Sequence, residues 1–332
     1  MRVLVSLCAT LVVGAAVPAT AEEAGFSGYG PLPVRNFQPI QLIFLNLPFE
    51  RARTLRPGEL ELHVESAESN EIATNRRGVR AVLKFETNRT VIGSSIGVAP
   101  GLQIGLDVPF LSRFGGFLDP FVDSVEDLFQ TSNPERTLFP NNSFGAFHVR
   151  RGNVILFDGQ EQQVELGDVW ASAKYEVWHK PRFPLVAVRG AIKAPTGRAG
   201  GVFGSGKPDF GLGLAAEQRL RDWLLAYANF AVVYPVGPIT AARLTLNPII
   251  SGAAAAEARL SRHFSVLLQQ ETYTSPIHGT GASVLEGTVV ELTVGLNFAW
   301  QPFLVQLGAV NNVSGVATAA DFTLLLRLSY QR

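Results

Sequence analysis

The stretch PGLQIGLDVPFLSRFGGFLD, Pro100–Asp119, contains the pattern that decides the fold. From Leu102 to Phe110 apolar residues occupy every second position, with Gln103 and Asp107 among the residues between them. This period of two places the apolar side chains on one face of a β-strand. The question that follows is whether this face packs on a second sheet, on helices or on lipid.

The same alternation recurs along the chain and predicts about twelve strands. We expect them at Gly58–Ser66, Val79–Val98, Leu102–Phe110, Leu166–Trp178, Pro184–Lys193, Asp209–Leu220, Trp223–Tyr234, Leu244–Ser261, Phe264–Thr274, Gly287–Ala299, Phe303–Val310 and Asp321–Tyr330. The parity of the second strand slips near its middle, which indicates a bulge or two separate strands. Fourteen strands is therefore the alternative count.

Short and long connections take turns between these strands. The short ones include Ala99–Gly101, Arg221–Asp222 and Gln301–Pro302, and the long ones include Ala67–Gly78, Leu111–Glu165 and Ala194–Pro208. Such alternation is typical of an up-and-down antiparallel barrel in an outer membrane, with short periplasmic turns and long outer loops. We therefore predict an all-β transmembrane barrel over residues 58–332, with its apolar faces on lipid.

Aromatic residues mark the predicted ends of the strands. Trp178, Trp223 and Trp300 each lie beside a short turn, whereas Tyr234 and Tyr273 lie near the opposite ends. Indole and phenol rings favour the boundary between acyl chains and headgroups, so we expect two girdles of outward-facing rings.

The longest loop is predicted to contain one short helix, Asp119–Phe129. Asp119 is placed to cap it and Pro120 to be its first helical residue. The helix either packs over the rim of the barrel or forms a lid that folds into its mouth.

The first 21 residues read as a secretory signal peptide. A basic start precedes an apolar run, and Ala19-Thr20-Ala21 provides the small residues that a signal peptidase requires, so cleavage is predicted after Ala21. Export to the outer membrane of a Gram-negative bacterium follows, with membrane lipid and the outer-membrane assembly machinery as expected partners. Formal net charge is zero, which argues against a nucleic-acid partner.

Residues 22–57 form a proline-rich segment with no sustained period. Leu42, Phe44 and Leu47 belong to an apolar cluster bracketed by Pro39 and Pro48, and proline cannot donate to a strand ladder. An exposed cluster of this kind is unusual in a free tail. The segment is therefore predicted to enter or cover the periplasmic mouth of the barrel as a plug.

Charged residues occupy the opposite face of the strands, and this face would line the lumen. The main candidates are Asp107, Asp168, Lys174, Glu176, Arg189, Lys193, Glu217, Arg219, Glu257, Arg259, Glu291 and Arg327, and Glu59, Glu61, Lys84, Glu86 and Glu271 are placed with them. Both signs are mixed, so we expect pairing across neighbouring strands. Either these charges only hold the interior together, or they line a narrow polar passage for a small-molecule solute.

The sequence contains few signs of chemistry. The five histidines lack metal-ligand spacing, and no catalytic or nucleotide-binding motif is complete, so neither metal nor cofactor is predicted. Ser143 and His148, which both fall in the long loop, are the nearest approach to a lipid-acting catalytic pair. An enzyme is accordingly the third interpretation.

Several strings resemble one family of proteobacterial envelope proteins, catalogued as domain of unknown function 3187. They are GPLPVRNFQPIQLIFLNLP, GLQIGLDVPFLSRFGGFLDPFVDSVEDLF, LGDVWASAKYEV, IKAPTGRAGGVFGSGKPDFGLGLA and ADFTLLLRLSY, which span most of the mature chain. The fourth string also resembles outer-membrane proteins encoded with phenol meta-cleavage pathways, and this implies an uptake channel. Many such barrels end on an aromatic residue, whereas Gln331 and Arg332 follow Tyr330 here.

The preferred function is thus a narrow channel or uptake protein for small molecules. The alternative is a non-transporting structural or assembly protein of the outer membrane with a plugged lumen.

Overall fold

The computed structural model describes residues 26–332 except residues 77, 130–133, 179–182 and 240–242. The predicted signal peptide and its cleavage after Ala21 lie outside the described residues. Within the described ranges, no helix is long and apolar enough to cross a membrane.

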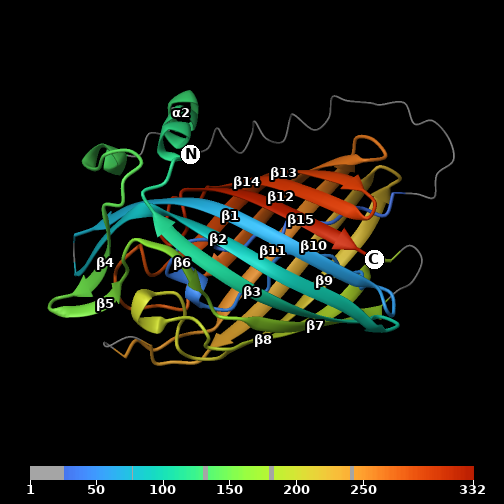
Figure 1. The fold of residues 1–332 in the computed structure, drawn as a ribbon, viewed down its shortest axis with the longest axis horizontal. Coiled ribbons are helices and arrows are strands. Elements are labelled where there is room, and N and C mark those ends of the chain that lie inside the picture. The colour runs from blue at the N-terminus through green and yellow to red at the C-terminus, as the bar shows by residue number, and fades with distance from the viewer. Residues whose placement is uncertain (1–25, 77, 130–133, 179–182, 240–242) are drawn as a thin grey trace.

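Twelve antiparallel strands form one closed wall (Figure 1). Their bounds are β1 Leu60–Asn75, β2 Val79–Ala99, β3 Leu102–Phe114, β7 Trp170–Trp178, β8 Leu185–Lys193, β9 Asp209–Arg221, β10 Leu224–Pro235, β11 Ile249–Arg259, β12 Phe264–Thr274, β13 Thr288–Trp300, β14 Phe303–Asn312 and β15 Phe322–Gln331. Each strand pairs with the next along the chain. Pairing of β1 with β15, from Glu61 opposite Gln331 to Asn70 opposite Phe322, closes the barrel.

All twelve predicted strands are confirmed, and the alternative of fourteen is wrong. The second predicted strand is the single strand β2, which pairs with β1 without interruption from Asn75 opposite Ala81 to Leu60 opposite Ile96. The predicted long loop Ala67–Gly78 is also wrong, because β1 continues to Asn75. This part of β1 has polar residues on both faces, so its sequence does not alternate between apolar and polar residues and did not predict a strand.

The apolar faces predicted to meet lipid lie on the outside of the barrel. Leu106 and Leu326, for example, are each about half exposed, whereas the intervening side chains are buried or half-buried. Trp178, Trp223 and Trp300 are exposed at the rim of the short turns. The prediction for Tyr273 was wrong, because this ring is buried inside the barrel.

The longest connection, between β3 and β7, contains further short elements. They are α2 Asp119–Phe129, the 3-10 helix η2 Pro134–Leu138, and the strands β4 Ala146–Arg151, β5 Val154–Asp158 and β6 Gln162–Leu166. Strand β4 pairs with β2 and β6 pairs with β3, so both extend the wall beyond the rim. Two other 3-10 turns are η1 Gln41–Ile43 and η3 Ala199–Gly201.

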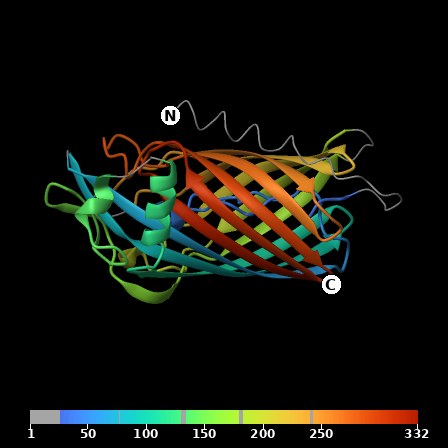
Figure 2. The ribbon, with the colours of Figure 1, turned by 90° about the horizontal axis from the view of Figure 1, so that it is seen from above.

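Helix α2 packs on the outside of the wall (Figure 2). Leu118 and Val122 contact Phe322 and Ala309, whose side chains face away from the lumen. The lid interpretation of this helix is therefore wrong.

The same loop explains a second error, concerning Lys84 and Glu86. Both lie on the outward parity of β2, like the exposed Ile92, and not in the lumen. The loop buries them: Lys84 forms an ion pair with Asp119, and Glu86 accepts hydrogen bonds from the backbone N–H groups of Phe117 and Leu118.

Candidate functional site

A segment of the chain itself occupies the lumen. Residues 26–57, which we call the N-terminal hairpin, run through the interior as the blue trace inside the barrel (Figure 2). The segment starts at the rim of the short turns, where the Tyr29 hydroxyl donates to the Arg262 carbonyl. It turns around η1 near the long loops, where the Gln38 side-chain amide donates to the Val284 carbonyl. It then returns to the first rim and enters β1.

The rising arm of the hairpin is held by side chains of β11 to β14. Glu257 of β11 accepts hydrogen bonds from the backbone N–H groups of Tyr29 and Gly30 at 3.0 and 3.1 Å. Gln269 of β12 accepts one from the Leu32 N–H at 2.6 Å. Since the proline-rich arm makes no ladder with the wall, these side chains satisfy backbone groups that strand pairing would otherwise satisfy.

The returning arm is held by β7 to β10 in the same way. Asp209 accepts a hydrogen bond from the Leu45 N–H at 2.8 Å, and Lys193 donates to the Ile43 carbonyl at 2.5 Å. Lower down, Glu176 accepts from the N–H of Thr54 at 2.6 Å. The wall therefore binds both arms mainly through their backbone.

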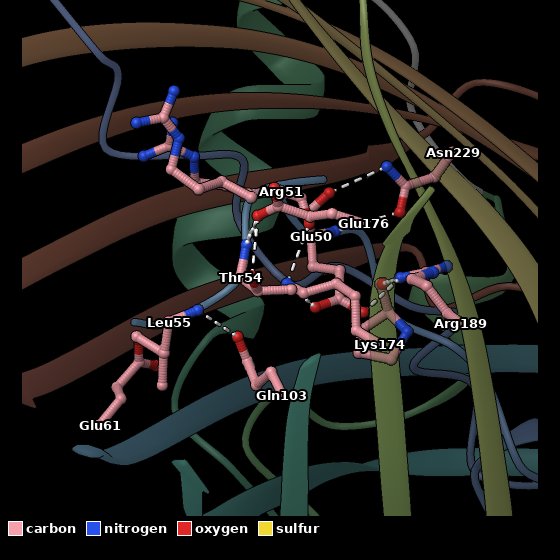
Figure 3. Close-up of polar contacts among 12 residues, drawn as sticks. Glu50, Arg51, Thr54, Leu55, Glu61, Gln103, Lys174, Glu176, Arg189 and Asn229 are labelled. Atoms are coloured by element: carbon pink, nitrogen blue, oxygen red, sulfur yellow. Dashed lines mark hydrogen bonds and ion pairs between the residues drawn. The ribbon is translucent and has the colours of Figure 1, made fainter. Parts of the chain in front are cut away.

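Ion pairs add to these contacts on the returning arm (Figure 3). Glu50 lies between Lys174 and Arg189, at 2.8 Å from the amine and 2.9 Å from the guanidinium. Burial alone would raise the pKa of the Glu50 carboxyl, but the charges of Lys174 and Arg189 outweigh it and lower the pKa to about 2. Arg51 makes a two-donor contact with Glu217 at 2.9 and 3.1 Å.

Apolar packing completes the fit of the hairpin. Leu32 is fully buried against the wall at two glycines: a Cβ at Gly295 would come within 2.2 Å of Leu32, and a Cβ at Gly308 within 2.4 Å. Glycine at these inward positions leaves the room that the leucine side chain fills.

The structure brings half of the twelve candidate residues onto the hairpin through polar contacts. These residues are Lys174, Glu176, Arg189, Lys193, Glu217 and Glu257. Arg259 joins them through its guanidinium, which lies 5.8 Å from the ring centroid of Phe26.

The remaining candidates have other surroundings. Asp107 contacts His63 at 2.8 Å, Asp168 contacts Lys193 at 2.8 Å, and Arg327 contacts Glu61 at 2.8 Å. Glu291 is buried opposite Glu271 on the neighbouring strand, so two carboxyl groups and not an oppositely charged pair face each other there. Arg219 is exposed near the rim. Asp107, Asp168 and Arg327 therefore pair with residues of the wall, the hairpin contacts seven other candidates, and Glu291 and Arg219 belong to neither group.

The sequence reasoning missed the neutral members of this site. Gln103, Asn229, Gln269, Asn297 and Gln306 all hydrogen-bond the hairpin. They occupy inward-facing positions of the strands and could have been identified by this alternation. Only charged residues, however, were considered as lumen candidates, and amides were not. Asp209, another missed residue, lies on the inward face with Glu217.

The hairpin leaves part of the lumen open. A cavity of about 250 Å³ lies between the hairpin and the wall formed by β1, β2, β3, β7, β8, β14 and β15. Its lining includes Arg35, Arg89 and Arg189, together with Glu65 and Trp170. The guanidinium of Arg89 pairs with Glu65 at 2.8 Å and lies 5.2 Å from the ring centroid of Trp170.

The loop residues considered for catalysis are engaged elsewhere. The Ser143 hydroxyl donates to the Pro140 carbonyl at 2.6 Å, and the ring of His148 pairs with Asp158. Among the described residues, no group of three His, Cys, Asp or Glu side chains is arranged to hold a metal ion.

Comparison with solved structures supports the fold. The COG4313 outer membrane channel from Pseudomonas putida F1 superposes with a TM-score of 0.58 at 12% identity, covering 85% of this chain and 98% of that chain. The toluene transporter TbuX of Ralstonia pickettii has a TM-score of 0.40 at 9% identity, covering 85% and 90%, and the CymD monoaromatic hydrocarbon channel has 0.38 at 12%, covering 92% and 94%. The first likeness shows an outer-membrane β-barrel fold, and the other two are too weak to support an argument.

Comparison by sequence places the chain in a family. No curated protein sequence matches it. The family described as "Protein of unknown function (DUF3187)" matches residues 4–331, nearly the whole chain. The resemblance seen in the sequence strings is thereby confirmed, and the chain belongs to the DUF3187 family.

Proposed function

We propose that this protein is a channel for small molecules in the outer membrane, and that the N-terminal hairpin closes its lumen in the state described here. The observation that carries the proposal is the way in which the hairpin is held. It occupies the lumen through side-chain hydrogen bonds, ion pairs and apolar contacts. Each strand of the wall is paired on both sides without it.

This arrangement makes the obstruction separable from the wall. Moving the hairpin breaks no hydrogen bond between barrel strands, and the hairpin leads into β1 at Pro57, which bridges to Gly97. The 250 Å³ cavity beside the hairpin is the start of a path that displacement of the returning arm would widen. The COG4313 outer membrane channel shares the fold.

Complete spontaneous release of the hairpin is excluded by its apolar burial. Leu32, Phe37, Ile40, Phe44 and Leu45 are each at most 2% exposed. At about 1.5–3 kcal/mol per buried side chain, these five alone oppose release by roughly 7–15 kcal/mol. We therefore expect low conductance at rest, and opening through movement of part of the hairpin.

Deletion of residues 22–56 behind the intact first 21 residues tests this proposal. The barrel should fold, judged by a gel mobility that changes on boiling, and its single-channel conductance in a planar bilayer should exceed that of the full chain. Deletion of residues 120–129, which removes most of α2 from outside the wall, is the matched control and should leave conductance unchanged. A folded hairpin deletion that conducts no better than the full chain would reject the proposal.

A structural barrel with a permanently plugged lumen is the second candidate. The observation that favours it is the same burial, because the hairpin contributes side chains to the largest apolar clusters of the described residues. Under this candidate the hairpin deletion should fail to fold or lose heat resistance, with no gain in conductance.

We also propose export and insertion into the outer membrane. The supporting observations are the signal-peptide pattern and the outward apolar band with its exposed tryptophans. Fractionation should recover the protein with outer membranes, and its N-terminal sequence should begin at Glu22. Recovery from the soluble periplasm would contradict the proposal.

A further inference from the structure

The lining of the large cavity carries an excess of positive charge. Among the described residues that line it, seven are Arg or Lys and four are Asp or Glu. The cavity is partly enclosed by the wall and the hairpin, and such an excess acts more strongly there than on an open surface. The solute most strongly favoured inside it is therefore an anion.

Two of these arginines have nitrogen donors without a hydrogen-bond partner among the described residues. Arg189 is 4% exposed, and its Nε and Nη2 have no hydrogen-bond partner among the described residues. Its Nη1 donates to the Pro48 carbonyl at 2.7 Å and to Glu50 at 2.9 Å. Nε and Nη2 form one edge of the guanidinium, and its two parallel donors match the two oxygens of a carboxylate. Both atoms have almost no accessible surface in this state, so a ligand in the cavity reaches this edge only when the neighbouring side chains move.

Arg35 is the second arginine of this kind. It is 6% exposed, and its Nη2 donates to the backbone carbonyls of Gln41 and Phe44. Its Nε has no hydrogen-bond partner in the part of the chain that the structure describes. Burial and the neighbouring charge of Arg89 lower the pKa of the Arg35 guanidinium to about 9. An anion near Arg35 would relieve both effects.

The size and the walls of the cavity restrict the anion further. A volume of about 250 Å³ lies just below the range of roughly 300–1,000 Å³ that is usual for small-molecule sites. Trp170, Val91 and Ala191 supply an apolar wall beside the arginines. Arg189 also borders a second cavity of about 10 Å³, which holds no more than a water molecule. Only the larger cavity can therefore take an organic ligand.

We propose that the cavity between the N-terminal hairpin and the wall is a binding site for a small organic carboxylate, with the Nε–Nη2 edge of Arg189 as its carboxylate-binding group and Arg35 as a second cation. This proposal deepens the proposed channel function, on which it rests, by naming the chemical class of the solute. Binding, however, can be measured without transport.

The experiment measures ligand binding to the purified full chain in detergent by titration calorimetry. Benzoate is the probe, and benzamide, which has nearly the same shape without the charge, is its control. Arg189→Lys keeps a cation near Glu50 but removes the two-donor edge, so benzoate affinity should fall at least about tenfold. Arg219→Lys makes the same change outside the cavity and should leave affinity unchanged. Gel mobility without boiling checks that each variant is folded.

The outcomes separate the two proposals. Benzoate binding that exceeds benzamide binding and weakens in Arg189→Lys supports the site, even if the hairpin deletion never conducts and the channel function fails. Equal binding of benzoate and benzamide, no binding of either, or an unchanged affinity in Arg189→Lys overturns the site. The channel proposal would then still stand on the conductance of the hairpin deletion.

Discussion

Glu50 and Lys174, 124 residues apart in the sequence, form an ion pair with 2.8 Å between Oε2 and Nζ. The contact joins the returning arm of the hairpin to β7, and Arg189 of β8 contacts the other carboxylate oxygen. One hairpin side chain thus neutralises two buried cations of the wall, so this carboxylate is where a single substitution should loosen the hairpin most.

Glu50→Gln should weaken the attachment of the returning arm. It leaves the amine of Lys174 and the guanidinium of Arg189 buried without a negative partner, at a cost of about 1–3 kcal/mol, with Glu50 itself being partly exposed. We expect higher conductance than in the unmodified chain, measured in planar bilayers. Glu161→Gln, which changes an exposed loop carboxyl, is the control. Equal conductance in all three proteins would show that this pair does not restrain the hairpin.

The same pair predicts a response to acid. The pKa of Glu50 is lowered from 4.5 to about 2 in the folded protein, so its contribution to stability is fully present above about pH 4.5 and is lost as pH falls towards 2. Conductance recorded from about pH 6 to about pH 3 should therefore rise below about pH 4.5. Glu50→Gln should show a smaller rise over this window, and an identical pH profile would exclude Glu50 as its source.

Gly295→Ala should disturb the rising arm. The added methyl group would lie 2.2 Å from the Leu32 side chain, which is fully buried and also confined by Gly308. Overpacking of this kind costs about 1–3 kcal/mol. We expect faster hydrogen exchange at the hairpin amides around Leu32. Gly252→Ala, where the nearest neighbouring atom is 3.7 Å away, should leave exchange unchanged.

Leu106→Arg tests the lipid face. Leu106 is about half exposed on the outside of β3, and an arginine near the bilayer midplane costs about 2–4 kcal/mol. The free energy of unfolding in lipid vesicles should fall by this amount, whereas Leu106→Met should change it little. Similar stability of the two variants would mean that this face does not contact acyl chains.

Alternation of apolar and polar residues was sufficient to predict the wall but not its contents. In Leu102–Phe110 and the other predicted strands, apolar residues at every second position mark the outward face. All twelve strands could therefore be identified from their own sequences. Beyond Ser66 the two faces of β1 are covered by the hairpin and by the loop that carries α2, so polar residues such as Asn70 are buried on the outward side. The alternation of residues within a strand cannot show that another segment of the chain covers its faces.

The site was harder to predict because its partners are distant in sequence. The alternation in β13 places Asn297 on the inward face, but it does not indicate that the Asn297 amide donates to the Gly30 carbonyl and to Glu257, at 3.1 Å in each case. The proline-rich hairpin has no repeating apolar pattern and forms no strand ladder, so no register aligns it with the wall. The sequence therefore cannot indicate which side chain of the wall binds which backbone group of the hairpin. The inward glycines Gly295 and Gly308 were the available sign that something packs against the wall there.

Closure of the wall by β1 and β15 also bears on the order in which the protein folds. The hairpin directly precedes β1, whereas its partners include Gln306 and Thr318, which are synthesised almost 300 residues later. The rising arm therefore cannot reach its final contacts until the last strands exist, and the β1–β15 seam encloses it once formed. Contacts so far apart in sequence form late, so we expect the rising arm to settle in the interior among the last steps of folding.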